Sequence, residues 1–384
     1  MEFALTDDQR MLVDTVASFV KKDSPVSRAR AMRDDPLGWS RDVLRKMGDL
    51  GWLGVAFPES VGGLGGSFVD VMLMLEQLGS TLVPEPLLSS MILSGFAVLH
   101  AGTSEQHARW LPSLIDGSST LALAYAEEGS RYDLARVATT ADKSAKGYTL
   151  RGKKRFVLDG NAASAIVVSA RTSGKPGDRE GVSLFVVDPG ASGLRVTGAH
   201  LIDGRRATML ELAGVEVEEG RRLGDEGNAL GALERAIDSA AAAACAEGLG
   251  IMDAVLTMTR DYLSQREQFG VKIGTFQALQ HRAVDMFVET ELARSTAILA
   301  ALSIGNDDAI ARQRGVSAAK VQLAIGGRFV TQQSIQLHGG VGITEEHDVG
   351  LYFKRMQALD SLFGDEEHHV RRFADLTMPR TPSA

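Results

Sequence analysis

Three short segments in the second half of the chain combine residue types that bind a diphosphate-containing ligand. They are Tyr262–Gly270, which contains Arg266 and Phe269, then Phe276–Gln280, and Gln336–Gly342. An arginine near a helix end can bind a diphosphate through paired hydrogen bonds, a phenylalanine offers an aromatic face, and glycines let backbone amides approach a ligand. Taken singly, such residues are more often a surface arginine, a core phenylalanine and a helix C-cap. Their combination predicts an ADP-like pocket.

Other common ligand sites have no support in the sequence. There is no P-loop, and the glycine clusters near Gly63, Gly248 and Gly340 do not complete a GxGxxG segment after a strand. The histidines include no HExxH pair, and Cys245 is the only cysteine, which excludes an internal disulfide and a multi-cysteine metal site. We therefore expect no metal, and a cytoplasmic location fits this cysteine content.

The composition is that of a globular protein without an obvious charged partner. Of the 384 residues, 44% are hydrophobic and 23% charged, and the formal net charge is -8. Nothing in this balance favours nucleic acid or an anionic membrane surface. The N-terminus carries acidic residues where a secretion signal would be basic, and no segment approaches about 18 uninterrupted apolar residues. We expect no targeting or membrane segment.

The elements that must position the three segments change in type along the chain. Capping-box patterns at Thr6–Gln9, Ser67–Asp70 and Thr103–Gln106 predict helices, so residues 1–117 form an N-terminal helical domain. Glycine-punctuated segments rich in apolar and β-branched residues then predict an antiparallel β-barrel over residues 118–222. These strands are Tyr148–Val157, Ala165–Ala170, Val182–Val187 and Ala207–Val217.

Helical periodicity returns over residues 223–384 and predicts a C-terminal four-helix bundle. The fold class is therefore α+β and mostly α. Within this bundle the alanine run Ala240–Ala244 has two interpretations, a helix packed closely against a neighbour or a widened pocket for a bulky substrate, and close packing is favoured.

These motifs and this order of domains resemble the acyl-CoA dehydrogenase family. Its members share an Arg-x-x-Phe-Gly segment, a downstream Phe-Gln or His-Gln pair and a Gln-x-x-Gly-Gly-x-Gly segment at the separations found here. The resemblance extends over nearly the whole chain and includes the N-terminal loop Ala56–Gly65, with Glu76 and Gly79. It implies FAD, a tetramer and an acyl-CoA substrate, with an electron-transfer flavoprotein as the expected electron acceptor.

In that family the flavin lies between subunits, and one chain binds the ADP half of a flavin whose ring is seated on its neighbour. The residues that the resemblance assigns to this role are Arg266, Gln268, Phe269, Phe276, Gln277, Gln336, Gly339 and Gly340.

The catalytic base of the family is missing at both of its usual positions. The family reaction removes an α-proton from an acyl-CoA thioester while hydride leaves the β-carbon for the flavin, and it needs a carboxylate base. In most members this is the Glu of a Tyr-Glu-Gly-Thr segment, and Phe363 occupies that position here. Other members carry the base on the earlier long helix, where this chain has Ala240, followed by Ala241 in place of a frequent arginine. The catalytic residue is therefore unknown.

The residues that would hold the flavin ring are altered as well. The family's Thr-Glu-Pro-Gly segment appears as Ala126–Gly129, and its Trp-Ile-Thr segment as Phe156–Leu158. Two hydroxyls that would donate hydrogen bonds to the ring are lost. Retention of one half-site beside loss of the other resembles the small, non-catalytic subunit type, such as that assigned to pimeloyl-CoA dehydrogenase.

We therefore expect an FAD-dependent acyl-CoA dehydrogenase in which this chain is the non-catalytic subunit of a heterotetramer and completes the FAD site of its partner. One alternative is a self-sufficient homo-oligomer with a relocated base, for which Glu234 and Asp365 are the nearby carboxylates. Another is a flavin-free scaffold subunit. The subgroup resemblance suggests lipid or steroid catabolism, with a dicarboxylic or steroid-derived acyl group.

Overall fold

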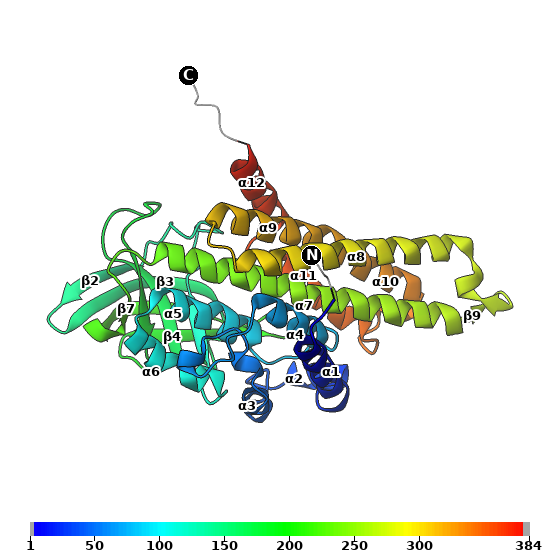
Figure 1. The fold of residues 1–384 in the computed structure, drawn as a ribbon, viewed down its shortest axis with the longest axis horizontal. Helices are drawn as coiled ribbons and strands as arrows, with labels where there is room; N and C mark the ends of the chain where they lie inside the picture. Colours follow the sequence, from blue (N-terminus) through cyan, green and yellow to red (C-terminus); the bar gives the residue numbers. More distant parts are fainter. Residues whose placement is uncertain (1–3, 379–384) are drawn as a thin grey trace, which may run out of the picture. The chain divides into compact units, whose positions relative to one another are not determined.

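The computed structural model describes residues 4–378 of the chain (Figure 1). Within them, contact density separates two compact units. The helical unit comprises the N-terminal residues through Ala31, Ser67–Val83 and the residues from Ala241 onward. The sheet unit comprises Met32–Gly66 and Pro84–Ala240. The domain boundaries expected near residues 117 and 222 stay a prediction.

Short helices of the sheet unit surround a glycine-rich loop. The predicted capping box at the start of α6 is present, because Thr103 Oγ1 accepts from Gln106 N at 3.4 Å and Gln106 Oε1 accepts from Thr103 N at 3.0 Å. In the loop, a Cβ added to Gly63 would lie 2.1 Å from the Phe57 carbonyl oxygen, so only glycine fits there. The helical segments are α3 (Arg41–Asp49), η1 (Trp52–Gly54), η2 (Glu59–Val61), η3 (Leu87–Ser94), α5 (Gly95–Ala101), α6 (Ser104–Ile115) and η4 (Glu219–Arg221).

The described part of the sheet unit forms an eight-stranded sheet in the order β6-β7-β3-β2-β4-β5-β8, with β1 paired to β4. All four predicted strands are present, and most neighbours pair antiparallel, as expected for the middle domain. Strand β1 departs from that pattern because it runs parallel to β4. The strands are β1 (Leu121–Ala124), β2 (Thr140–Ser144), β3 (Gly147–Leu158), β4 (Ala165–Arg171), β5 (Val182–Val187), β6 (Leu194–His200), β7 (Arg206–Glu218) and β8 (Arg222–Leu223).

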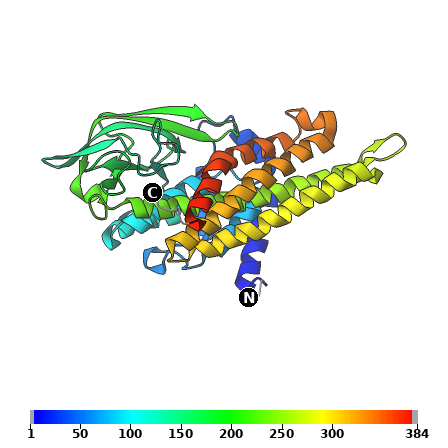
Figure 2. The ribbon, with the colours of Figure 1, turned by 90° about the horizontal axis from the view of Figure 1, so that it is seen from above.

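Long helices form the helical unit, and α7 and α8 run side by side in both views (Figures 1 and 2). Arg294 of α8 ties the helices together, since it pairs with Glu76 of α4 at 2.5 Å and with Asp253 of α7 at 2.7 Å. The other predicted capping boxes, at Thr6–Gln9 and Ser67–Asp70, are confirmed. The elements are α1 (Asp7–Lys22), α4 (Phe68–Gly79), β9 (Glu267–Gln268), β10 (Val271–Lys272), η5 (Ile273–Thr275), α8 (Gln277–Ile304), α9 (Ala309–Gln322), η6 (Leu323–Gly327), α10 (Arg328–His338), η7 (Gly339–Ile343), α11 (Val349–Ser361) and α12 (Glu366–Thr377).

Two helices cross the division between the units, namely α2 (Val26–Met32) and α7 (Leu230–Gln265). The side chains of Ala240–Ala244 on α7 are at most 2% exposed, which confirms close packing. A Cβ added to Gly250 would lie 1.9 Å from the Glu76 carbonyl oxygen, so α7 and α4 approach closely. By length and composition alone α7 could cross a membrane, but 72% of its most apolar window is buried inside the protein, which is typical of a core helix.

Candidate functional site

The first predicted segment lies where α7 ends in the β9–β10 hairpin. Arg266 is the first residue after α7, and its backbone is fixed because its N–H donates to Tyr262 O at 2.8 Å and its carbonyl accepts from Ile273 N at 2.9 Å. The Arg266 side chain is exposed and makes no hydrogen bond or ion pair within residues 4–378. The Arg266 guanidinium therefore projects from a fixed backbone, and its N–H donors are available to a ligand.

An aromatic pair lies beside this arginine. Phe269, at the tip of the hairpin, is 91% exposed and has φ of 56°. Phe276, which precedes α8, is 38% exposed, and the two ring centroids are 6.2 Å apart at an interplanar angle of 72°. Gln268 and Gln277 are exposed at the hairpin and at the start of α8. An aromatic side chain left in solvent to this extent is unusual in a folded chain, and it indicates a surface that something else covers.

The glycine segment follows α10, whose last turn carries the exposed Gln336. Gly339 has φ of 60° and ψ of -141°, a conformation that is essentially restricted to glycine, and its N–H already donates to Gln336 O. Gly340 differs because its φ is not positive and an added Cβ would meet nothing within 4 Å. The chain itself therefore does not require glycine at Gly340, whereas close approach of a ligand would.

The helical unit brings these segments together. The ring of Tyr262, one turn before Arg266, lies 4.5 Å from the ring of His338, which directly precedes Gly339. Arg282 on α8 donates to Gln333 Oε1 on α10 at 3.0 Å. The arginine, the hairpin and the glycine segment thus belong to one packed group of helix ends.

His338 was not singled out from the sequence, although it lies inside the glycine motif. Its Nδ1 is 2.7 Å from the Ser334 carbonyl oxygen, which can only accept, so Nδ1 carries the proton. Its Nε2 is buried and has no hydrogen-bond partner in the described part of the chain. Burial lowers the pKa of His338, so the ring is neutral and Nε2 is an unused acceptor. The open space at Gly340 fits the close approach of a nucleotide to the backbone.

The segment after α11 contains the position where the sequence comparison expected a base. Phe363 is only 4% exposed and has φ of 62°. Its carbonyl oxygen lies 3.2 Å from His369 Nε2, and the buried Lys320 ammonium donates to the carbonyl oxygens of Leu359 at 2.6 Å and Leu362 at 2.9 Å. Buried donors therefore hold this backbone in place, and an apolar ring is packed at the position of interest.

Models of one protein family match consecutive parts of the chain. They are the acyl-CoA dehydrogenase N-terminal domain over residues 6–118, the middle domain over 122–215 and the C-terminal domain over 229–376. The chain belongs to the acyl-CoA dehydrogenase family. Membership implies FAD as the cofactor and acyl-CoA oxidoreduction as the class of reaction.

Relatives of this acyl-CoA dehydrogenase family member cover its whole length. It is 29% identical to acyl-CoA dehydrogenase FadE27 of Mycobacterium tuberculosis, over 97% of each chain. Among solved structures, the ChsE4–ChsE5 complex from Mycobacterium tuberculosis is 28% identical over 100% of each chain with a TM-score of 0.88. A variant of the Tcur3481–Tcur3483 steroid ACAD is 29% identical over 96% of this chain and 97% of the other, with a TM-score of 0.86.

Both carboxylates nominated as a relocated base are engaged in structural contacts. Asp365 is the N-cap of α12, and its Oδ1 accepts from His368 N at 2.9 Å. Glu234 forms two hydrogen bonds with Arg179, at 2.8 and 3.0 Å. A third carboxylate, Asp360, escaped the sequence analysis: burial raises its pKa, and its Oδ1 is buried without a hydrogen-bond partner in the described residues.

The part of the sheet unit that would face a flavin ring offers fewer donors than the family pattern. Ala126 and Leu158 supply no side-chain hydroxyl, and Phe156 is 47% exposed with φ of 55°. The retained Glu127 is committed elsewhere, because its Oε1 accepts from the buried Lys154 ammonium at 2.6 Å and its Oε2 from Ala138 N at 2.7 Å. These residues do not fit a flavin ring that needs side-chain donors from this chain.

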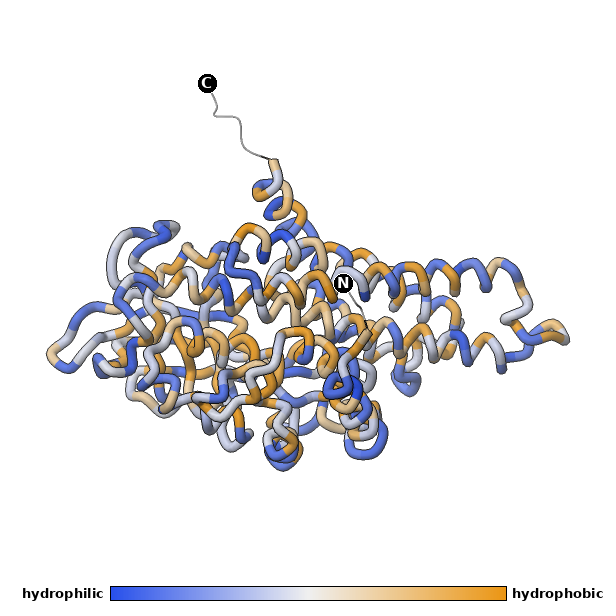
Figure 3. Tube along the Cα trace, in the orientation of Figure 1, coloured by the Kyte–Doolittle hydropathy of each residue, from blue (hydrophilic) through white to orange (hydrophobic). Residues whose placement is uncertain are grey.

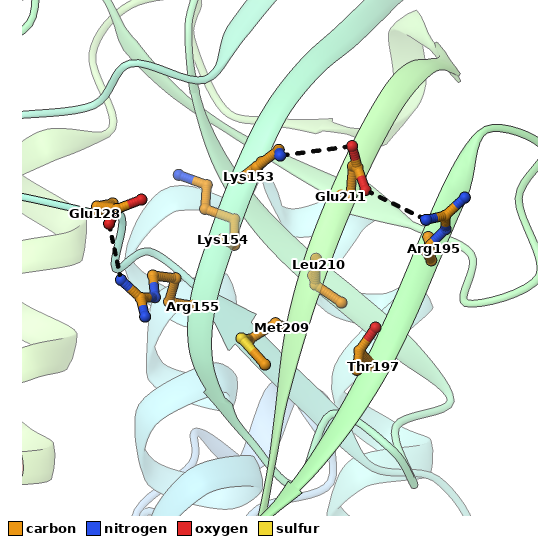
Figure 4. Close-up of a pocket in the computed structure, with 9 residues that line it drawn as sticks. All are labelled: Glu128, Lys153, Lys154, Arg155, Arg195, Thr197, Met209, Leu210 and Glu211. Carbon is orange, nitrogen blue, oxygen red and sulfur yellow. Dashed lines mark ion pairs between the residues drawn. The ribbon is translucent and has the colours of Figure 1, made fainter.

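A groove of about 290 Å³ lies on the outer face of strands β3, β6 and β7 (Figure 4). Its three exposed cations face two carboxylates: Arg155 lies 3.4 Å from Glu128, and Lys153 and Arg195 lie 3.6 and 3.8 Å from the single carboxylate of Glu211. Exposed pairs at such distances contribute little to stability. These residues leave the groove a small excess of positive charge.

No group of three or more His, Cys, Asp or Glu side chains that could hold a metal lies together among residues 4–378.

Proposed function

We propose that this chain is the non-catalytic subunit of a heterotetrameric acyl-CoA dehydrogenase and completes the FAD site of a separate catalytic subunit. The observation that carries the proposal is the contrast between two positions. Arg266 is exposed and makes no side-chain hydrogen bond within residues 4–378, and Gly340 borders open space. Phe363, in contrast, fills the position of the base with a buried ring.

The ADP side of the site is assigned to residues of the helical unit. Arg266 would bind the diphosphate through two parallel hydrogen bonds, and Phe269 would cover an apolar face of the nucleotide. Gly340 would admit the ligand to the backbone. Gln268, Phe276, Gln277 and Gln336 are exposed around this group and are assigned to the same contact. When bound, FAD supplies the hydride acceptor of the family reaction.

Proton abstraction is assigned to the partner because this chain offers no prepared base at the expected position. A general base must stand within hydrogen-bond reach of the proton that it removes. Phenylalanine cannot do so, and the surrounding segment is held by Lys320 and His369. Burial, followed by the charge of Lys320, lowers the pKa of His369 to about 2, so its ring also stays neutral.

An exposed apolar surface on α8 supports association with another chain. Its residues recur at helical spacing, are 47–57% exposed and lie along the helix whose hydrophobic positions Figure 3 marks in orange. We call it the α8 stripe: Val284, Phe287, Val288, Leu292, Leu299 and Leu302.

The similar structures with two named chains, ChsE4–ChsE5 and Tcur3481–Tcur3483, support a partner that is itself an acyl-CoA dehydrogenase subunit. The name of the second structure, a steroid ACAD, supports a steroid-derived acyl-CoA as substrate. A dicarboxylic acyl group rests on the subgroup resemblance alone. We assign electron transfer to an electron-transfer flavoprotein and the assembly to the cytoplasm, as expected for the family and for a chain with one cysteine.

The test compares the chain alone with the chain co-expressed with an acyl-CoA dehydrogenase gene from its genomic neighbourhood. We expect little FAD in the lone protein, stoichiometric FAD in the complex, and loss of FAD from the complex with Arg266→Ala. Arg260→Ala is the matched control, because Arg260 is on the same helix but pairs with the adjacent Asp261 at 3.0 Å. A lone protein that carries stoichiometric FAD and oxidises acyl-CoA would refute the proposal, and a colourless complex would favour the flavin-free scaffold.

The second candidate is a self-sufficient homo-oligomer with a relocated base. The raised pKa of Asp360 favours it, since a partly buried carboxyl with a raised pKa can act as a base; its Oδ1 has no hydrogen-bond partner in the described residues, although its Oδ2 lies 3.8 Å from Arg328. Asp360→Asn and Asp365→Asn, each with FAD content measured, separate the candidates. Loss of flavin reduction by substrate at constant FAD content supports the relocated base, and unchanged rates end it.

A further inference from the structure

The loop that follows the glycine segment, Thr344–Asp348, is joined to a distant part of the sequence. After η7 the chain crosses this loop before α11 begins at Val349. Within the loop, His347 Nδ1 accepts from Val349 N at 3.3 Å, and the His347 ring lies 4.6 Å from that of His338. These contacts are local, so they do not fix the loop relative to the N-terminal helices of the helical unit.

Arg30 of α2 supplies that connection. Its Nη1 donates to the carbonyl oxygen of Glu345, and its Nη2 donates to the carbonyl oxygen of Glu346 at 3.3 Å and to Asp348 Oδ1 at 2.7 Å. One guanidinium therefore binds two consecutive backbone carbonyls and a carboxylate. The side chains of Arg30 and Asp348 are 32% and 39% exposed, so the pair is partly shielded from solvent.

The contact between Arg30 and the loop matters because the glycine segment, which precedes the loop, is itself packed tightly against α10. Gly342 packs against α10 so closely that a Cβ would lie 2.5 Å from the Ile335 carbonyl oxygen. Between Gly342 and α11, the Thr344 N–H is bound locally to Val341 O at 3.1 Å, whereas the carbonyl oxygens of Glu345 and Glu346 are bound by Arg30 from a helix distant in the sequence. Hydrogen bonds from a charged donor to backbone carbonyls restrict main-chain motion more than a contact between two exposed side chains does.

We infer that Arg30 is a positioning residue for the nucleotide-binding glycine segment: it fixes residues 345–348 and thereby keeps Gly339–Gly342 in the conformation that receives FAD. The inference rests on the proposed function for its consequence in binding. Its structural part, the restriction of the loop by Arg30, can be measured without any flavin.

The first measurement is amide hydrogen exchange in the purified chain. Arg30→Ala should speed exchange in residues 339–348 by about 2- to 30-fold, the range expected for a residue that acts through a packed network, and leave exchange elsewhere unchanged. Arg30→Lys, which keeps the charge but loses the forked geometry, should give a smaller increase. Lys354→Ala is the control, because Lys354 pairs with the same loop only through the Glu345 side chain, at 2.8 Å.

The second measurement is FAD affinity of the co-expressed complex, from flavin fluorescence on dilution. Arg30→Ala should weaken it by a similar factor, and Lys354→Ala should not. Unchanged exchange in residues 339–348 of Arg30→Ala would overturn the inference, and if that variant does not fold, unchanged exchange in Arg30→Lys would do so. If Arg266→Ala keeps its FAD, the proposed function fails, whatever Arg30 does to the loop.

Discussion

Replacement of Gly340 by alanine should separate the stability of this chain from its ability to bind flavin. The added Cβ meets no atom within 4 Å, and the backbone φ is not positive, so alanine can adopt the native conformation. A compatible Gly→Ala change stabilises a protein by about 0.4–1 kcal/mol, because it restricts the unfolded chain. We therefore expect Gly340→Ala to unfold at the same or a slightly higher urea concentration.

The same methyl group would occupy the space that we assign to the nucleotide. If it displaces one charge-assisted hydrogen bond between backbone and diphosphate, the loss is about 1.5–3 kcal/mol, which corresponds to about a 10- to 150-fold weaker FAD affinity. The matched control is Gly350→Ala on α11, where an added Cβ also meets nothing within 4 Å and φ is not positive. Gly350→Ala should show the same small change in stability as Gly340→Ala, and the FAD affinity of the unsubstituted complex.

The assay is urea denaturation of each variant, followed by circular dichroism, beside FAD titration of the co-expressed complex. The reasoning fails if Gly340→Ala binds FAD as tightly as the unsubstituted complex. It also fails if Gly340→Ala is destabilised by more than about 1 kcal/mol, since the chain would then need this glycine for its own packing.

Other variants test the remaining parts of the structure. Phe269→Ala should leave the unfolding midpoint unchanged, because the ring is 91% exposed, and should lower the FAD content of the complex. Asp365→Ala should lower stability by about 1 kcal/mol through loss of the α12 N-cap without affecting turnover by the complex. Arg355 donates to the Glu247 carboxylate at 2.7 and 2.8 Å, and both side chains are buried. Glu247→Gln should lower the free energy of unfolding in urea by about 3–5 kcal/mol, because it removes the charge that balances the buried Arg355. Replacing both residues by methionine should cost much less. Burial lowers the pKa of Lys320 from 10.5 to about 8. Between these two pH values the unfolded chain binds more protons than the folded chain, so the free energy of unfolding should rise with pH. Lys320→Met should reduce this rise.

The sequence predicted those elements whose signals are local. The three capping boxes and strands β3, β4, β5 and β7 carry their patterns within a few residues, and all are present. Strand β6 was missed because none of its seven residues is buried and five are exposed: as an edge strand it has no buried face, and so no alternation of apolar residues. Strand β1 was missed because four buried apolar residues do not distinguish a strand from a helix.

Long-range polar partners could not be predicted in this way. Glu247 and Arg355 are separated by 108 positions, and nothing in either neighbourhood indicates that the two side chains meet. The contact between His369 Nε2 and the Phe363 carbonyl oxygen, at 3.2 Å, is another that no local pattern in the sequence indicates. Comparison of motifs shows which residue types occupy such positions, but only the folded structure shows which side chains contact each other.

Gly339, Gly340 and Gly342 belong to one motif, but the structure does not explain the glycine in the same way at each of them. Gly339 is explained by its backbone conformation and Gly342 by its packing against α10, so both would be retained in a chain that binds no ligand. Gly340 has neither explanation. Gly350 on α11 also has neither, so Gly340 indicates a ligand only in combination with the exposed Phe269 of the same group of helix ends. Phe363 and its buried donors show the opposite pattern, since every contact that explains them lies within the chain. The surface around Gly340 is open, whereas Phe363 is packed by its own chain, and this contrast is what we expect of the proposed subunit, whose partner would contribute the base and the flavin ring.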